Sequence, residues 1–102
     1  MGDFEVVTTI DDEDERAALV VSGELDMRAA FKLESGLDRL LRERVVRRLE
    51  LDLSGVSFVD SAGLGSLLST HERAKDLGIE MKLVNPSDPV RRILEVTGIG
   101  GI

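Results

Sequence analysis

The strongest constraint on the fold is a change of hydrophobic period in the middle of the chain. Leucines alternate with acidic residues from Leu49 to Leu53, which predicts a strand (residues 45–54) with one covered face. Further on, Leu64, Leu67, Leu68 and Ala74, with the amphipathic His71, recur at helical spacing and predict the inner stripe of a helix. The stretch from Phe58 to Gly65 is therefore a strand-to-helix junction, and the chain is expected to be an α/β protein.

The other segments complete the order β-β-α-β-α-β-α. Strands at 4–10 and 17–22 are joined by an acidic hairpin tip. The helix that follows can be capped by Asp26 and runs to about Arg44. The junction helix ends at Gly78, a strand covers 79–84, and a short helix capped by Asp88 ends at Gly98. We predict a single domain, residues 1–102, with a small mixed sheet of four to five strands and helices mainly on one face.

Charge and composition narrow the classes of partner. The formal net charge of −7 opposes binding to nucleic acid or anionic membranes and favours a basic protein partner. There is no cysteine, no signal peptide and no apolar run long enough to cross a bilayer, so a cytoplasmic protein is expected. The acidic tip at 11–15 lacks the glycine and distant glutamate of a calcium loop, and neither a metal nor a cofactor is predicted.

The junction itself combines cap residues with glycines. Asp60 and Ser61 are both favoured N-cap residues. Gly63 and Gly65 follow within the first turns, although each costs about 1 kcal/mol relative to alanine inside a helix. Two interpretations remain open: another molecule approaches this backbone closely, or the small residues let the helix pack on a neighbouring element.

Two enzymatic or ligand-binding interpretations of Ser61 are weak. His71 is the only histidine, and it lies ten residues along the same helix, about 15 Å away, so it cannot activate Ser61 as a nucleophile. The elbow motif Gly-x-Ser-x-Gly is also absent around Ser61. Gly63 and Gly65 form only a fragment of a dinucleotide motif, because Leu68 occupies the last glycine position, and Asp60 opposes a free phosphate.

Covalent phosphate on Ser61 fits the same residues better. It would add about 1.5 to 2 negative charges at the positive end of the helix dipole, which the fold tolerates but a docked partner does not. Along the helix, Gly65 and Ser69 continue the flank of Ser61 with small side chains, and Glu72 and Asp76 make its far end acidic. We therefore predict that Ser61 is a reversible phosphorylation site within a protein-docking surface.

Three motifs resemble the STAS domain of bacterial anti-sigma factor antagonists: Gly23-Glu24-Leu25-Asp26, the strand 49–54, and the junction 56–65. The resemblance implies partner switching. The unphosphorylated domain binds an anti-sigma factor that is also a serine kinase, and this frees the sigma factor for transcription. The kinase phosphorylates the serine matching Ser61, the complex separates, and a metal-dependent serine phosphatase resets it. Ala62 replaces a frequent second Ser or Thr, which leaves Ser61 as the single acceptor.

We therefore expect a substrate and binding partner without catalytic activity, monomeric when free. The predicted contact region surrounds Ser61 and consists of Asp26, Asp60, Gly63, Gly65 and Ser69. The alternatives are a scaffold or ligand-sensing module of a stress-signalling or transporter-linked complex, in which Ser61 is only a helix cap, and a nucleotide-binding domain that uses the helix N-terminus.

Overall fold

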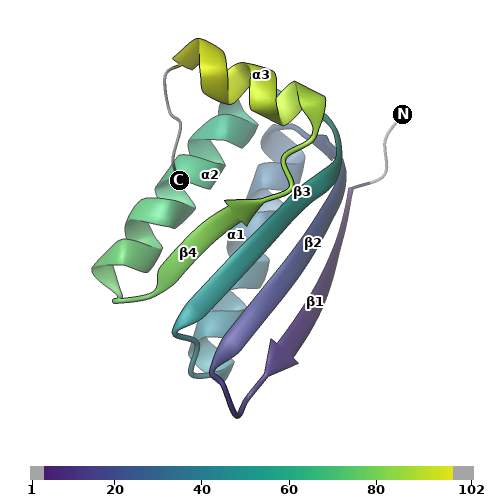
Figure 1. Cartoon of the computed structure of the whole chain (residues 1–102). Coiled ribbons are helices and arrows are strands. Elements are labelled where there is room, and N and C mark those ends of the chain that lie inside the picture. Colours follow the sequence, from purple (N-terminus) through teal and green to yellow (C-terminus); the bar gives the residue numbers. More distant parts are fainter. Residues whose placement is uncertain (1–3, 98–102) are drawn as a thin grey trace.

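The computed structural model describes residues 4–97, which form seven elements in the predicted order (Figure 1). The strands are β1 (Glu5–Asp11), β2 (Arg16–Leu25), β3 (Arg48–Val59) and β4 (Glu80–Val84). The helices are α1 (Met27–Glu43), α2 (Ser61–Asp76) and α3 (Asp88–Thr97). The predicted helix end at Gly98 lies outside the described residues.

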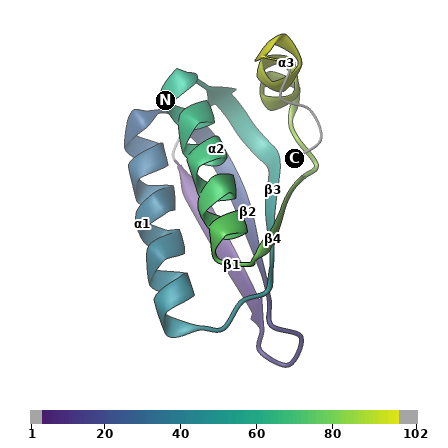
Figure 2. The same cartoon turned by 90° about the vertical axis from the view of Figure 1, so that its left-hand side faces the viewer.

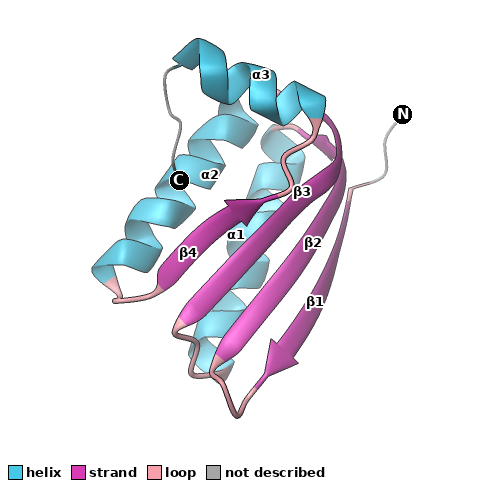
Figure 3. Ribbon diagram, viewed as in Figure 1, coloured by secondary structure: helices cyan, strands magenta, loops and turns pink. Residues whose placement is uncertain are grey.

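The four strands form one mixed sheet in the order β1-β2-β3-β4 (Figure 3). β1 pairs antiparallel with β2 through the acidic tip, whereas β2, β3 and β4 are parallel neighbours. α1 and α2 lie side by side on one face of the sheet, and α3 packs against β3 from the opposite side (Figure 2). The predicted α/β fold with helices mainly on one face is confirmed.

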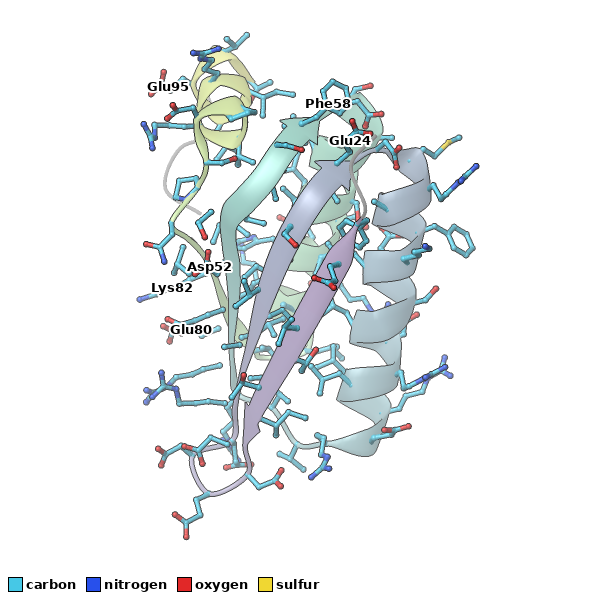
Figure 4. All side chains as sticks on the ribbon, turned by 90° about the vertical axis from the view of Figure 1, so that its right-hand side faces the viewer. Glu24, Asp52, Phe58, Glu80, Lys82 and Glu95 are labelled. Carbon is cyan, nitrogen blue, oxygen red and sulfur yellow. The ribbon has the colours of Figure 1, made fainter. Side chains whose placement is uncertain are left out.

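The core lies between the sheet and the pair α1 and α2. Leu49, Leu51 and Leu53 of β3 are almost completely buried, and each contributes roughly 1.5–3 kcal/mol of hydrophobic stabilisation. The alternating Glu50 and Asp52 lie on the other face and are only half-buried, as the period-two pattern predicts. Figure 4 shows Asp52, Glu80 and Lys82 along this face, which no helix covers at that level.

Several element boundaries differ from the predictions. β2 continues to Leu25, and β3 begins at Arg48 rather than residue 45 and continues to Val59. The extra residues of β3 show no strict alternation, but they pair in parallel with the end of β2, across register shifts after Val20 and Gly23. Long-range backbone pairing therefore extends both strands beyond what the side-chain pattern indicated.

The helix ends also shift by one residue. The C-cap of α2 is Leu77, and Gly78 follows it with a φ of 76°, a conformation that glycine adopts without strain. α3 already includes Asp88, and the N–H of Arg91 donates to the carbonyl of Ser87 at 2.8 Å. Asp88 is therefore the first helical residue of α3 and not its N-cap.

Candidate functional site

The N-termini of α1 and α2 lie next to each other at one edge of the sheet (Figure 2). Leu25 ends β2 and pairs with Val59, which ends β3, so the following residues Asp26 and Asp60 are neighbours. The N–H of Asp60 donates to the carbonyl of Leu25 at 3.4 Å and links the two junctions. This arrangement follows from parallel strands, whose carboxyl ends meet at the same edge.

Each of these two aspartates caps its helix. Oδ1 of Asp26 accepts a hydrogen bond from the N–H of Ala29 at 2.9 Å, and Oδ1 of Asp60 accepts one from the N–H of Gly63 at 2.8 Å. Both carboxylates face the positive ends of the helix dipoles, and a cap of this kind stabilises a helix by about 1 kcal/mol. Of the two cap residues that the sequence offered at the junction, Asp60 is the N-cap.

Ser61 is consequently the first helical residue of α2, and its side chain is exposed. Within residues 4–97 its hydroxyl donates to no protein acceptor and accepts from no protein donor. The hydroxyl is therefore chemically accessible at the positive end of α2. A buried hydroxyl would have excluded the docking interpretation, and Ser61 is not buried.

The two junction glycines have opposite environments. A Cβ built on Gly63 would lie only 2.1 Å from the carbonyl oxygen of Leu25, so α2 approaches the end of β2 too closely for any side chain. A Cβ built on Gly65 would meet nothing within 4 Å. The prediction that Gly63 presents open backbone to a partner is wrong, because Gly63 is buried against Leu25 and serves internal packing.

One flank of α2 is open along its whole length. Ser61, Gly65, Ser69, Glu72 and Asp76 are all exposed, as the helical spacing predicted. The first three are small, and the last two carry negative charge at the end of α2 distant from Ser61. Asp26 and Asp60 are half-buried beside the first turn. Apart from Gly63, the predicted contact residues are therefore exposed or half-buried, at the N-termini of α1 and α2 and along the outer flank of α2.

Sequence reasoning missed the exposed hydrophobic side chains around this surface. On α1, Met27 and Phe31 are each 73% exposed, and Phe58 near the end of β3 is 48% exposed. Figure 4 places Phe58 beside Glu24, its pairing partner on β2. The sequence could have predicted their exposure on α1, because Met27 and Phe31 do not share the helical spacing of the inner stripe that includes Leu33 and Leu37.

The geometry limits other chemistry at Ser61. His71 is half-buried on the same helix, about 15 Å along the axis from Ser61, so it cannot act as a general base for that hydroxyl. The groove between α1 and α2 beside Ser69 has a volume of about 170 Å³, below the roughly 300–1,000 Å³ of ordinary ligand pockets. In the part of the chain that the structure describes, no three His, Cys, Asp or Glu side chains cluster as a metal site would require.

None of the helices formed by residues 4–97 has both the length and the hydrophobicity needed to span a membrane. α1, the longest of these helices, is amphipathic and buries only one side, which includes Leu33, Leu37 and Leu40.

The protein is therefore a small α/β domain. Its four strands form a mixed sheet, and two aspartate-capped helices begin at the carboxyl ends of parallel strands. The profile of the STAS domain matches residues 6–102, and the chain belongs to that family. The chain is 32% identical over 92 residues to the anti-sigma F factor antagonist of Paenibacillus polymyxa, covering 88% of this chain and 79% of that protein. It is 33% identical over 85 residues to the anti-sigma-B factor antagonist of Listeria monocytogenes, covering 82% and 73%.

Solved structures show the same fold. The anti-sigma factor antagonist SpoIIAA in its unphosphorylated form superimposes with a TM-score of 0.77 at 23% identity, covering 96% of this chain and 83% of SpoIIAA. The phosphorylated form of SpoIIAA from Bacillus superimposes with a TM-score of 0.72 at 22% identity, covering 96% and 86%.

Proposed function

We propose that this protein is an anti-sigma factor antagonist controlled by phosphorylation of Ser61. The unphosphorylated form binds an anti-sigma factor that is also a serine kinase and thereby releases the sigma factor. The contact surface has Ser61 at its centre and includes Asp26, Asp60, Gly65 and Ser69. The observation that carries the proposal is that Ser61 is exposed and unbonded at the start of α2, because Asp60 already caps the helix.

Electrostatics explain how one phosphate can act as a switch. A phosphoserine carries about 1.5 to 2 negative charges at pH 7, and the N-terminus of α2 partly stabilises them. The fold therefore accepts the modification. In the complex, the phosphate would lie inside the contact area, beside the carboxylate of Asp60. Removing both negative groups from water costs more free energy than the contact returns, so the complex separates.

A cycle of binding, phosphorylation and release also requires a second partner that removes the phosphate. A metal-dependent serine phosphatase removes the phosphate and restores binding. The protein itself acts as substrate and ligand, without catalytic activity, as a cytoplasmic monomer when free. Its net charge of −7 disfavours direct contact with nucleic acid or anionic membranes. The names of the anti-sigma F and anti-sigma-B factor antagonists among its relatives support the assignment.

The experiment is phosphorylation by a panel of purified anti-sigma factor serine kinases with ATP, followed by intact-mass measurement and peptide mapping. One phosphoryl group on Ser61 is expected, together with loss of the complex in gel filtration. Ser61→Ala should bind the kinase constitutively and remain unmodified. The matched control Thr9→Ala removes an exposed hydroxyl on β1, outside the contact surface, and should still be modified. Phosphate on another residue, or none with any kinase, contradicts the proposal.

A further inference from the structure

Two bulky hydrophobic side chains on α1 lie in solvent next to the proposed site. Met27 and Phe31 are each 73% exposed and are separated by one helical turn, so their side chains are neighbours on the helix surface. Most of their apolar surface contributes nothing to the core, since Ala30 and Leu33 provide the buried contacts of this turn. Neighbouring exposed apolar side chains of this size mark interaction surfaces.

The residues that line the groove between α1 and α2 show which side of α1 carries Met27 and Phe31. Glu34 and Asp38 of α1 line the groove that faces α2, and Asp38 forms an ion pair with Arg73 across it. Met27 precedes Glu34 by seven residues and Phe31 precedes Asp38 by seven, which is nearly two full turns. The pair therefore lies on the side of α1 that borders α2.

The helices are close together at this end. The hydroxyl of Ser66 on α2 lies 3.5 Å from the carbonyl oxygen of Ala30 on α1, one residue from Phe31. The facing outer positions of α2 are small: Ala62, Gly65 and Ser69. Met27 and Phe31 therefore form a hydrophobic ridge on α1 beside these small residues of α2. Figure 2 shows the ribbons of the two helices side by side at this end.

Resting on the function proposed above, we propose that Met27 and Phe31 are the hydrophobic anchors by which the anti-sigma factor kinase holds this protein. The kinase receives both side chains in an apolar pocket while its backbone lies over the small residues of α2. Fully desolvated aromatic side chains in such pockets contribute a large share of binding energy at interfaces.

The charges around the ridge define the partner further. Arg28 and Lys32 are exposed on α1 next to the anchor residues, whereas Glu72 and Asp76 make the far part of α2 acidic. A complementary partner has acidic groups at one border of its pocket and basic groups at the other, which sets the orientation of docking. A second copy of this chain is disfavoured as the occupant, because each copy carries a net charge of −7.

The test uses the kinase that modifies Ser61 and the variants Met27→Gln and Phe31→Ala. Both side chains are exposed and lie in a helix, so unchanged thermal midpoints are expected. Phe31→Ala should raise the Kd by at least about tenfold and Met27→Gln by several-fold, mostly through faster dissociation. The matched control is Leu77→Ala, since Leu77 is 58% exposed at the opposite end of α2, and it should bind like the wild type.

Kinetics of Ser61 phosphorylation give a second readout. The anchors do not touch the reacting atoms, so the variants should raise KM and leave kcat nearly unchanged. Normal phosphorylation of Ser61 with wild-type affinity in both variants overturns the anchor proposal and leaves the proposed function intact. If no kinase binds the wild type, both proposals fail. A dimer in sedimentation velocity that only Phe31→Ala dissociates, with unchanged kinase affinity, assigns the ridge to self-association and also overturns the proposal.

Discussion

Replacement of Gly63 by alanine tests most directly how α2 is attached to the sheet. The added Cβ would lie 2.1 Å from the carbonyl oxygen of Leu25 and 3.0 Å from both its carbonyl carbon and its Cγ. To relieve the first contact to 3.0 Å, the start of α2 must move away from β2 by about 0.9 Å. The obstacle is backbone, and it cannot rotate away as a flexible side chain can.

The energetic result combines two opposing effects. Overpacking costs about 1–3 kcal/mol, occasionally more, and the contact here is with a rigid carbonyl group. Alanine recovers up to about 1 kcal/mol of helix propensity. The shift also weakens the 3.4 Å hydrogen bond from Asp60 to Leu25. We expect a net loss of about 2 kcal/mol in the free energy of unfolding, or roughly 8–16 °C in Tm for a domain of this size.

The control is Gly65→Ala, two residues further along the same helix. A Cβ there meets nothing within 4 Å, so the variant should be more stable than the wild type by up to about 1 kcal/mol. Urea and thermal unfolding followed by circular dichroism measure both variants. Equal stability changes of the same sign at the two positions would refute the assignment of Gly63 to internal packing and Gly65 to open surface.

Three further perturbations have defined outcomes. Ser61→Asp should weaken kinase binding by tenfold or more while Tm changes little, because the helix dipole stabilises the new charge; isothermal titration calorimetry of a well-folded variant with wild-type affinity would count against the switch. Asp60→Ala removes the N-cap of α2 and should cost about 1 kcal/mol in urea unfolding, and no measurable loss would show that the cap is dispensable. The side-chain hydroxyl of Ser54, followed by its N–H and by Asn85, holds the pKa of Asp52 below its usual value of 3.8. Because the pKa of Asp52 is lowered in the folded state, its carboxylate stabilises the fold above pH 3.8, and this stabilisation is lost as the pH falls through the lower folded pKa. Asp52→Asn removes the titrating group, so the free energy of unfolding should fall less steeply below pH 4. Acid unfolding curves of the variant and the wild type measure this difference.

Much of the fold follows from local patterns in the chain. The alternation from Leu49 to Leu53 predicts a sheet with one covered face, and the structure buries these leucines while Glu50 and Asp52 face outward. The cap at Asp26 was also predictable, since aspartate is a favoured N-cap residue and Asp26 directly precedes a helical stripe. The ends of β2 and β3 were not, because bulges and long-range pairing decide them.

The candidate site was only partly predictable. Ser61 and its flank on α2 follow from helical spacing, and all five positions are exposed. The distinction between Asp60 as cap and Ser61 as first helical residue needed the backbone, since both residue types serve as caps. The hydrophobic residues Met27 and Phe31 could be placed on the side of α1 that borders α2 only once the two helices were seen as neighbours.

The sequence by itself determined the order of elements, the one-sided burial of the sheet and the position of Ser61 at the strand-to-helix junction. These depend on hydrophobic period and on hydrogen bonds within one or two turns, which are local quantities. Only the tertiary structure decided that Gly63 faces the carbonyl of Leu25 whereas Gly65 faces solvent, and that two helix N-termini share one edge. The physical reason is that the rotation and distance of α2 relative to β2 are set by packing between residues far apart in the chain, and no local pattern records them.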